Sequence, residues 1–554
     1  MKKLTLFALG LTALVVIVKT VSSKTPGTSS FSSSESSRIY APIQLPAFSA
    51  ESLTGIKTSQ DALKLIADSH ERAVFGWNPA FPVYIPAFDS TNAPYLRKHL
   101  RSQLTDLENG FVKFDGSQWV DLPLSAAALQ QEFSDTPIED LKRNNRQDIL
   151  WDPKMAVFDK DNVLYTALRV KDKNPFLRHY ALMYSRDGGS TWKTKKLLSS
   201  DNLPQWYDLE RPYSHAPLQG PPAFIYYKIV AKVPGYEKGF QDWQGTFGEL
   251  VLQTSHFNKQ ADLVLDTPIT ISHTAQPIGY RSGSAVKILR SGNKYFVVWL
   301  EATLNHPLEK NEQGRPTNIV PDKDGNPYSG IWIAEYDLVK KSLSKKEILR
   351  TWPVNDSHNQ PGIVRTSHGH LHVVGGSHGG HFTSTSSLKS DSISDWTPEQ
   401  YVNMTDSGYA ATYNIPGVPG GSQTYVSLIV DSKDQLHLAY RLWAQDRTIH
   451  DKEYFGALAY QTATVAEGKN QGWSTPKILV YPNAHDYSHY YQVLAIDRKD
   501  TLYLEYSQLR PWVPYFMKFA NQGNQEVFNT SPMQNSAILK STDQGKSWYL
   551  VDHF

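Results

Sequence analysis

Hydrophobic residues recur along this chain in short alternating runs, and a polar turn separates each run from the next. Five segments have this pattern most clearly, at residues 155–165, 285–299, 362–374, 426–438 and 493–504. In each segment, Asp, Asn, Gly, Ser or Lys residues lie between two runs with a period of two residues, which predicts a β-hairpin. The sequence therefore predicts an all-β protein.

Helical periodicity is scarce by comparison. Behind Ser59, the residues Leu63, Ile66 and Ala67 follow one another at steps typical of a helix, and residues 125–142 have the same character. We therefore expect short helical segments near the N-terminus and strands over the rest of the chain.

The hairpins recur at intervals of about 50 to 75 residues, which is the spacing of four-stranded propeller blades with loop insertions. Blade-like units occupy residues 73–122, 148–200, 206–265, 275–351, 356–403, 420–480 and 485–554. The sequence therefore predicts a seven-bladed β-propeller that forms one catalytic domain over residues 51–554.

Residues 185–192 and 541–548 share the pattern S-x-D-x-G-x-S/T-W, and each follows an apolar strand end. The pattern resembles the Asp-box of sialidase-like propellers. We expect the Asp side chain to accept turn N–H groups, the Gly to adopt a positive φ and the Trp to pack between outer strands. Such a motif indicates a fold more than a function, because it holds the blade together and rarely contacts ligand.

The N-terminal residues predict export. Lys2 and Lys3 precede an apolar run over residues 4–18, and small residues follow at 21–23, as in a secretory signal peptide over residues 1–23. The run is shorter than the ~20 residues of a membrane-spanning helix, and an uncleaved membrane anchor is the alternative. Residues 24–50 are rich in Ser and Thr and are expected to form a flexible leader. We expect a secreted protein, extracellular or periplasmic, with no membrane contact after cleavage.

Composition excludes several classes of protein. The chain has 56 Lys and Arg against 54 Asp and Glu, for a net charge of +2. It therefore lacks the basic excess of a nucleic-acid-binding protein. The absence of Cys excludes disulfides, thiolate metal sites and cysteine nucleophiles.

Candidate chemistry lies in two consecutive predicted blades. His358 and His378 lie on either side of a strand–turn–strand unit, so both can face the same end of the blade. In the next blade, Tyr425 and Arg441 lie across a second hairpin. We expect neighbouring blades to bring these four side chains to one face near the central channel.

These residues carry a family resemblance over residues 275–445. The motif D-x-H-N-x-P-x-I around His358, the Gly-flanked His378, and the pairs T-Y and Y-R that end in Tyr425 and Arg441 resemble the BNR-4 propellers. That group includes the ulvan lyases of polysaccharide lyase families twenty-four and twenty-five. The resemblance implies that these four residues form the active site, that Asn359 contacts substrate, and that the substrate is a sulfated rhamnose–uronate polysaccharide of the ulvan type.

The side chains suit β-elimination at a uronide. The reaction requires neutralisation of the C6 carboxylate, removal of the C5 proton and protonation of the departing O4. Arg441 offers a permanently charged fork for the carboxylate. Nearby cations would favour the ionised form of Tyr425, which could act as base and then as acid. His358 and His378 would complete the neutralisation or share the proton transfer, so no cofactor is required, although a structural cation stays open.

Other positions are secondary candidates. Tyr280 and Arg281 open the preceding blade and His489 opens the following one, where each could contact substrate. The alternating histidines of residues 368–372 are expected at the surface. His378 and His381 have a spacing that a metal could use, but no carboxylate lies nearby, and we expect no metal site.

Two other functions compete with the lyase. A sialidase-like glycoside hydrolase requires an arginine cluster, a Tyr nucleophile with a Glu partner, and an Asp acid; Tyr280 and Arg281 resemble the sialidase Arg-Ile-Pro entry only faintly, because Ile and Pro are absent. A non-catalytic carbohydrate-binding propeller is the third reading. In each case we expect a monomer.

Overall fold

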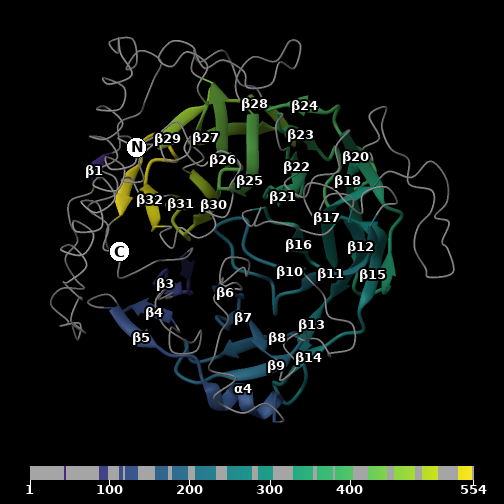
Figure 1. The fold of residues 1–554 in the computed structure, drawn as a ribbon, viewed down its shortest axis with the longest axis vertical. Coiled ribbons are helices and arrows are strands. Elements are labelled where there is room, and N and C mark those ends of the chain that lie inside the picture. The colour runs from purple at the N-terminus through teal and green to yellow at the C-terminus, as the bar shows by residue number, and fades with distance from the viewer. Residues whose placement is uncertain are drawn as a thin grey trace, which may run out of the picture.

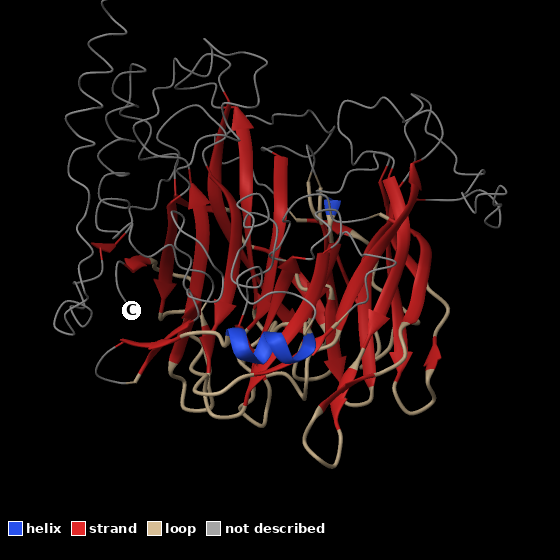
Figure 2. Cartoon of the chain, turned by 60° about the horizontal axis from the view of Figure 1, so that its bottom comes forward, coloured by secondary structure: helices blue, strands red, loops and turns tan. Residues whose placement is uncertain are grey.

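The computed structural model describes residues 43–44, 86–97, 111–115, 119–134, 156–171, 178–197, 206–232, 246–276, 285–302, 329–352, 359–377, 381–402, 422–445, 454–480, 489–508 and 535–551. Within these ranges the protein is built almost entirely of strands, as predicted, and the single α-helix is α4 (Ala126–Glu132) (Figure 2). None of the helices in the described ranges is long and apolar enough to cross a membrane.

Helix α4 lies within the segment predicted to be helical from residue 125. The Ser125 side chain caps the helix by accepting the Ala128 N–H at 3.1 Å, as expected for an N-cap serine. The helix ends at Glu132, well before residue 142, and residues 135–142 lie outside the described ranges. The other predicted helix, over residues 59–72, also lies outside them, as do residues 1–23.

The strands form antiparallel sheets that follow one another along the chain. The first sheet contains β2 (Ala87–Phe88), β3 (Pro94–Arg97), β4 (Phe111–Phe114) and β5 (Trp119–Leu122). The second contains β6 (Ala156–Phe158), β7 (Leu164–Lys171), β8 (Arg178–Ser185) and β9 (Lys193–Lys196). Both are simple meanders, which is the strand order of a propeller blade.

The middle of the chain forms a nine-stranded sheet with two halves. One half contains β10 (Trp206–Leu209), β11 (Phe224–Lys232), β12 (Thr246–Gln253) and β15 (Ile269–Ala275), and the β-ribbon of β13 (Ser255–Phe257) and β14 (Leu263–Leu265) lies beside it. The other half contains β16 (Ile288–Ser291), β17 (Lys294–Ala302), β18 (Ser329–Asp337), β19 (Ser342–Leu343) and β20 (Glu347–Trp352). One residue pair, Ala275 with Glu301, joins the halves. The predicted count of seven separate blades is therefore not confirmed.

Three further sheets complete the described fold. They are β21 (Gly362–Arg365), β22 (Leu371–Gly375), β23 (Thr383–Ser386) and β24 (Gln400–Tyr401); then β25 (Ser422–Val430), β26 (Leu436–Gln445), β27 (Tyr454–Ala466), β28 (Lys469–Trp473) and β29 (Lys477–Val480); and finally β30 (His489–Ile496), β31 (Leu502–Gln508), β32 (Asn535–Ser541) and β33 (Tyr549–Val551). Strand β1 (Ile43–Gln44), within the predicted leader, pairs with β33.

The sheets are arranged around a common centre (Figure 1), and the first strand of each hairpin predicted above lies nearest to it: β6, β16, β21, β25 and β30. This radial arrangement of four- and five-stranded meanders is that of a β-propeller. No sheet closes on itself within the described ranges. The innermost strands are therefore the elements that can present side chains to a central channel.

A shared turn follows the first strand of four sheets and lies at one end of the molecule, here called the turn end (Figure 2). In each turn, an Asp Oδ1 accepts the backbone N–H groups two and four residues further on, at 2.8–3.0 Å. The residue three positions after the Asp has a positive φ of 61–67°. The four turns begin at Asp89, Asp159, Asp431 and Asp497, and their positive-φ residues are Asn92, Asn162, Asp434 and Asp500.

These turns also bond to one another from sheet to sheet. The side chain of each positive-φ residue accepts a backbone N–H from the turn of the adjacent sheet: Asn162 from Ser90, Asn92 from Arg498, Asp500 from Ser432, and Asp434 from Ser367. The bond from Arg498 to Asn92, at 2.9 Å, joins the last sheet to the first across 406 residues of sequence. A turn hydrogen bond therefore joins the first and last sheets, which share no strand pairing within the described ranges.

The two S-x-D-x-G-x-S/T-W segments form the expected turns. Asp187 accepts the Thr191 N–H at 2.8 Å, and the Ser185 hydroxyl accepts the Gly189 N–H at 2.7 Å. The corresponding bonds in the second segment join Asp543 to Ser547 and Ser541 to Gly545, both at 2.9 Å. The Trp rings pack against the neighbouring sheet: Trp192 stacks on Phe111 at 5.8 Å, and Trp548 meets Tyr460 edge-on at 5.1 Å.

Apolar side chains fill the space between neighbouring sheets. One cluster joins Val364 and Val374 of the β21–β24 sheet to Leu428, Leu438 and Leu442 of the β25–β28 sheet. From Gln423 to Val430, every residue of β25 is buried, so this strand is covered on both faces. Because both faces are covered, a polar side chain on this strand is costly unless it has a hydrogen-bond partner inside the molecule.

Candidate functional site

The structure describes half of the eight predicted site residues. Asn359, Tyr425 and Arg441 are described with their side chains, and His489 is described only as the first residue of β30. His358, His378, Tyr280 and Arg281 lie outside the described ranges. The described residues lie at the end of the sheets opposite the turn end, which we call the site end.

Tyr425 lies on the innermost strand β25 at an irregularity of the backbone. It has a φ of +65°, and the register between β25 and β26 shifts between Thr424 and Ser427, as in a β-bulge. A positive φ is unusual for an aromatic residue, and bulges re-aim side chains where a sheet would otherwise continue regularly. The Tyr425 side chain is fully buried.

Arg441 lies on β26, opposite Thr424 in the register with β25. Its guanidinium carbon is 4.7 Å from the centre of the Tyr425 ring, and only 2% of the residue is exposed. A guanidinium over an aromatic face at this distance is a cation–π contact, which gains strength away from water. The structure therefore brings Tyr425 and Arg441 together, as the hairpin spacing predicts.

Asn359 and the glycine-rich segment before His378 lie against each other. A Cβ added at Gly376 would be 2.4 Å from the Gln360 carbonyl oxygen and 2.8 Å from the Asn359 carbonyl carbon. Only glycine fits such a close approach of two backbones. Asn359, which follows His358, therefore lies against Gly376, two positions before His378. The two histidines themselves lie outside the described ranges.

Hydrogen bonds join this segment to the next sheet. The Ser377 hydroxyl donates to the Gln423 carbonyl at 3.0 Å, and the Gln423 side chain accepts the Phe382 N–H at 2.7 Å. Gln423 also donates to Gln461 at 3.4 Å, and Gln461 accepts the Tyr440 hydroxyl at 2.7 Å. These contacts fix the β22 end of one sheet against the β25 strand that carries Tyr425.

Arg350 is a residue that sequence reasoning missed. From β20, its guanidinium donates at 3.5 Å to the carbonyls of Gly375, Gly376 and His381, and its Nε lies 3.2 Å from a Glu399 carboxylate oxygen. Burial lowers the pKa of Arg350 to about 10. Arg350 thereby ties together both sides of the segment that contains His378. Its flanking sequence carries no motif, so no signal was available.

The histidines of residues 368–372 differ from the surface prediction. His368 is exposed, but His370 Nδ1 donates to the Ser387 carbonyl at 2.9 Å, and Gly468 approaches its ring so closely that a Cβ would lie 2.5 Å away. His372 is buried with its Nδ1 2.8 Å from the Ser386 hydroxyl, and burial lowers its pKa to about 4. The surface prediction was wrong for His372 because both faces of β22 are covered.

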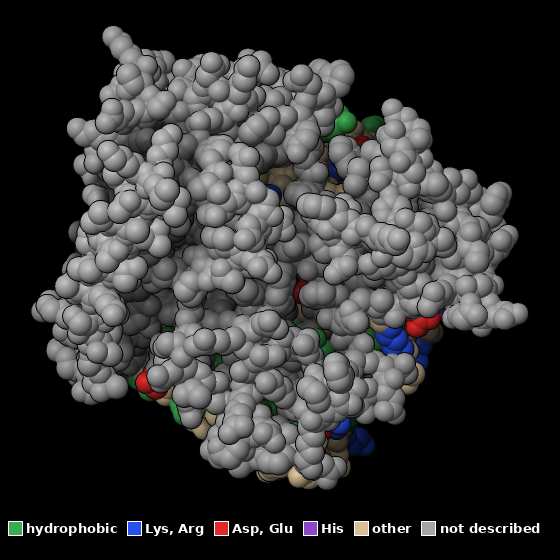
Figure 3. All heavy atoms as spheres, in the orientation of Figure 1, with side chains coloured by type: hydrophobic (Ala, Val, Ile, Leu, Met, Phe, Trp, Pro, Cys, Tyr) green, Lys and Arg blue, Asp and Glu red, His purple; other side chains and the backbone are tan. Residues whose placement is uncertain are grey.

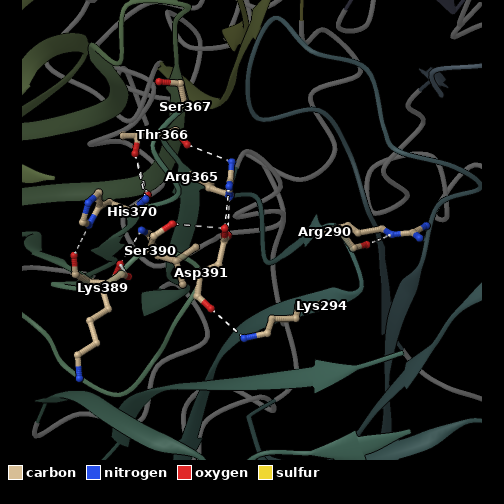
Figure 4. Close-up of polar contacts among 12 residues, drawn as sticks. Arg290, Lys294, Arg365, Thr366, Ser367, His370, Lys389, Ser390 and Asp391 are labelled. Carbon is tan, nitrogen blue, oxygen red and sulfur yellow. Dashed lines mark hydrogen bonds and ion pairs between the residues drawn. The ribbon is translucent and has the colours of Figure 1, made fainter. Parts of the chain in front are cut away.

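The same sheet carries an ion-pair network at its turn end (Figure 4). Arg365 forms a bidentate salt bridge with the Asp391 carboxylate, with hydrogen bonds of 2.6 and 2.8 Å. Lys294 of the preceding sheet donates to the Asp391 carbonyl at 3.0 Å. The hydrogen bond from Arg365 holds the pKa of Asp391 below its usual value. These charges stabilise contacts between sheets, far from Tyr425 along the strand direction.

Among the described side chains visible in Figure 3, basic and acidic groups lie near one another, and neither sign gathers into a broad patch. No three His, Asp or Glu side chains of the described ranges are grouped so that they could hold a metal ion.

Comparison with known proteins adds to this geometry. Residues 326–508 match the family model described as "BNR repeat-containing family member". The matched segment runs from just before β18 to the end of β31 and includes every predicted site residue except Tyr280 and Arg281. The resemblance to BNR-4 propellers is thus confirmed over these residues. No protein of curated function matches the chain.

Solved structures with low similarity include carbohydrate-active enzymes. A PL25 ulvan lyase bound to a GlcA(1-4)Rha3S repeat is 9% identical, with 78% of this chain and 92% of that chain covered and a TM-score of 0.36. An α-L-arabinanase from Penicillium chrysogenum in complex with arabinobiose is 12% identical, with 60% and 95% covered and a TM-score of 0.28. An α-L-arabinofuranosidase from Fusarium graminearum is 12% identical, with 72% and 93% covered and a TM-score of 0.32.

Proposed function

We propose that this protein is a secreted polysaccharide lyase that cleaves a uronic-acid-containing polysaccharide by β-elimination. The observation that carries the proposal is the contact between Arg441 and Tyr425, which places a permanent cation 4.7 Å from a phenol ring at the site end of two paired strands. The family match around these residues supports the same conclusion.

The reaction assigns a task to each group. Arg441 binds the C6 carboxylate of the uronide and disperses the negative charge that develops when C5 loses its proton. Tyr425, as the phenolate, takes the C5 proton; the C4–O4 bond breaks as the C4–C5 double bond forms, and the same phenol returns a proton to O4. His358 and His378 neutralise the carboxylate further or share the proton transfer.

The surrounding residues support substrate positioning. Asn359 is buried beside Gly376, next to the position that His358 occupies in the sequence, and contacts the sugar on that side of the site. We assign Tyr280, Arg281 and His489 to more distant sugar contacts, because they open the two flanking units of the ring. The substrate is an acidic polymer of the sulfated rhamnose–uronate type.

The proposal extends to architecture and location. The nine-stranded sheet consists of two four- to five-stranded meanders joined at one residue pair, and counting them separately gives a propeller of seven blades. Residues 1–23 direct export and are removed, so the mature enzyme acts outside the cytoplasm as a monomer.

The decisive experiment incubates the purified protein with ulvan and with other uronides, and follows ultraviolet absorbance and reducing ends in parallel. A lyase produces a conjugated 4,5-unsaturated uronide with each new reducing end. A glycoside hydrolase produces reducing ends without the chromophore, and a binding protein produces neither. Either of the last two results would reject β-elimination.

A further inference from the structure

Buried polar atoms without a hydrogen-bond partner in the described part of the chain lie on or next to three neighbouring innermost strands. The side-chain amide of Gln360, just before β21, has neither its Nε2 nor its Oε1 in a hydrogen bond within the described part of the chain. The same holds for the Thr424 hydroxyl on β25 and for the Gln492 Oε1 on β30. All three residues are at most 1% exposed.

The three groups lie at one level around the centre of the ring. Strands β21 and β25 touch at Gly362 and Val426, where a Cβ on the glycine would be 2.9 Å from a Val426 methyl. Gln360 and Thr424 each lie two residues before these contact positions, on strands that run in the same direction. The two segments also approach each other nearer the site end: the Gln360 carbonyl lies against Gly376, and the hydroxyl of the next residue, Ser377, donates to the Gln423 carbonyl. Gln360 and Thr424 therefore lie at the same end of neighbouring sheets.

Gln492 belongs to the same level on the third strand. Its Nε2 donates to the Tyr425 carbonyl, and two residues later the Leu494 N–H donates to the Ser427 hydroxyl at 2.7 Å. These bonds align β30 with β25, so that Gln492 lies beside the Thr424–Tyr425 bulge. We call Gln360, Thr424 and Gln492 the polar collar.

Buried polar groups without a partner lower the stability of the free protein. A buried amide or hydroxyl without a partner loses its hydrogen bonds to water and gains none, and native proteins keep few of them. Gln360 alone can donate two hydrogen bonds and accept two. The collar carries no formal charge, so it matches uncharged hydroxyl groups, while the charged Arg441 nearby matches a carboxylate.

We propose that the polar collar binds the free hydroxyl groups of the rhamnose next to the uronate, and so helps to select a polymer in which uronate and rhamnose alternate. This inference rests on the proposed function, because it concerns the same site. Gln360 is its main member, since both ends of its amide are unused. It acts by positioning substrate and takes no part in proton transfer.

The test replaces Gln360 by Met, which has a similar shape and no amide. Gln276 provides a matched control: it is fully buried, both its amide atoms lack partners within the described chain, and it lies at the end of β15 in a different sheet. For each variant we would measure the melting temperature and, by calorimetry, the affinity for a saturated glucuronate–rhamnose disaccharide.

We expect both variants to melt at or above the temperature of the wild type, because an unused buried amide is replaced by an apolar group. Only Gln360→Met should weaken disaccharide binding, by about tenfold, which corresponds to the loss of one or two neutral hydrogen bonds. Binding of glucuronate alone should change little in either variant, because Arg441 holds the carboxylate.

Two results would overturn the collar. A lower melting temperature for Gln360→Met would mean that its amide has a structural partner, and unchanged disaccharide affinity would mean that it does not contact the sugar. A wild-type protein that binds neither the disaccharide nor glucuronate would reject the proposed function together with the collar. Failure of the collar proposal can therefore be distinguished from failure of the proposed function.

Discussion

The two ends of the innermost strands are built on opposite principles. At the turn end, polar side chains are satisfied within a few residues of sequence: Asp497 Oδ1, for example, accepts the N–H groups of Lys499 and Thr501 at 2.8 and 2.9 Å. At the site end, Gln360 and Thr424 are buried, and their side chains have hydrogen-bonding groups without a partner among the described residues.

This difference separates stability from function. Satisfied turn groups hold neighbouring sheets together and have nothing left to offer a ligand. Unsatisfied groups at the site end lower the stability of the free protein and keep their capacity for a substrate. Substitutions at the turn end should therefore reduce stability and spare activity. Substitutions at the site end should reduce activity and spare stability.

The largest effect is expected from Tyr425→Phe, which removes one hydroxyl from the site end. Elimination should fall by a factor of about 10² to 10⁴, because no base is left for the C5 proton. Absorbance of the unsaturated product and thermal melting would measure activity and stability together.

The matched control is Tyr503→Phe at the turn end, where the phenol hydrogen-bonds to Asp497. This variant should lose stability and keep its activity. Full turnover in Tyr425→Phe would contradict the assignment of the base.

The second-largest effect is expected from Arg441→Met, which removes the charge that binds the uronate and retains much of the buried volume. We expect kcat/KM to fall by a factor of about 10² to 10³, as when a preorganised electrostatic group is deleted. Initial rates on a uronide polymer would measure the loss.

Arg365→Met, which removes the ion pair with Asp391 at the turn end, is the comparison variant. Its rates should match those of the wild type. Equal losses of activity in the Arg441 and Arg365 variants would contradict the distinction between the site end and the turn end.

Asp497→Ala tests the turn end directly. The substitution removes acceptors for two backbone N–H groups and for the Asn92 side chain, so we expect a loss of about 2–4 kcal/mol in the free energy of unfolding. Urea unfolding would measure this loss, and activity at low temperature should stay unchanged. Asp161→Ala is the control, since its side chain is 64% exposed and should cost little.

The smallest effect concerns the pH dependence of stability at Asp391. Because the bond from Arg365 lowers the pKa of the folded carboxyl, its contribution is present above the usual Asp value of ~4 and is lost as the pH falls through the folded value. Asp391→Asn should therefore cost about 1 kcal/mol at neutral pH and nothing in strong acid. Urea unfolding at several pH values would detect this convergence; a constant difference would contradict it.

The individual Asp turns of the turn end could be predicted from the sequence because the hydrogen bonds within each turn are local. The spacing from Asp431 to Asp434 encodes a turn that needs only its own residues, and Asp187 is followed at fixed intervals by the groups that it binds. The hairpin spacing also predicted the meeting of Tyr425 with Arg441, since both lie on paired strands.

The rest of the site depends on contacts between sheets, which no local pattern encodes. Arg350 reaches the carbonyl of His381 from a strand of the preceding sheet. Gln360 is fully buried, and its side-chain amide has no hydrogen-bond partner within the described ranges. His372 alternates with His370 in sequence like a surface residue, yet the packing of sheets on both faces buries it. In each case, burial by distant segments decided the role of the side chain.

The bond between Asn92 and Arg498 has a consequence for synthesis. The first sheet leaves the ribosome long before its partner exists, and 406 residues separate the two contact positions. At ~5–20 residues per second, a nascent chain waits roughly 20–80 seconds with that seam open. During this interval the Asn92 turn of the first sheet lacks its partner, so the contact between the first and last sheets forms only after the C-terminal sheet has been synthesised.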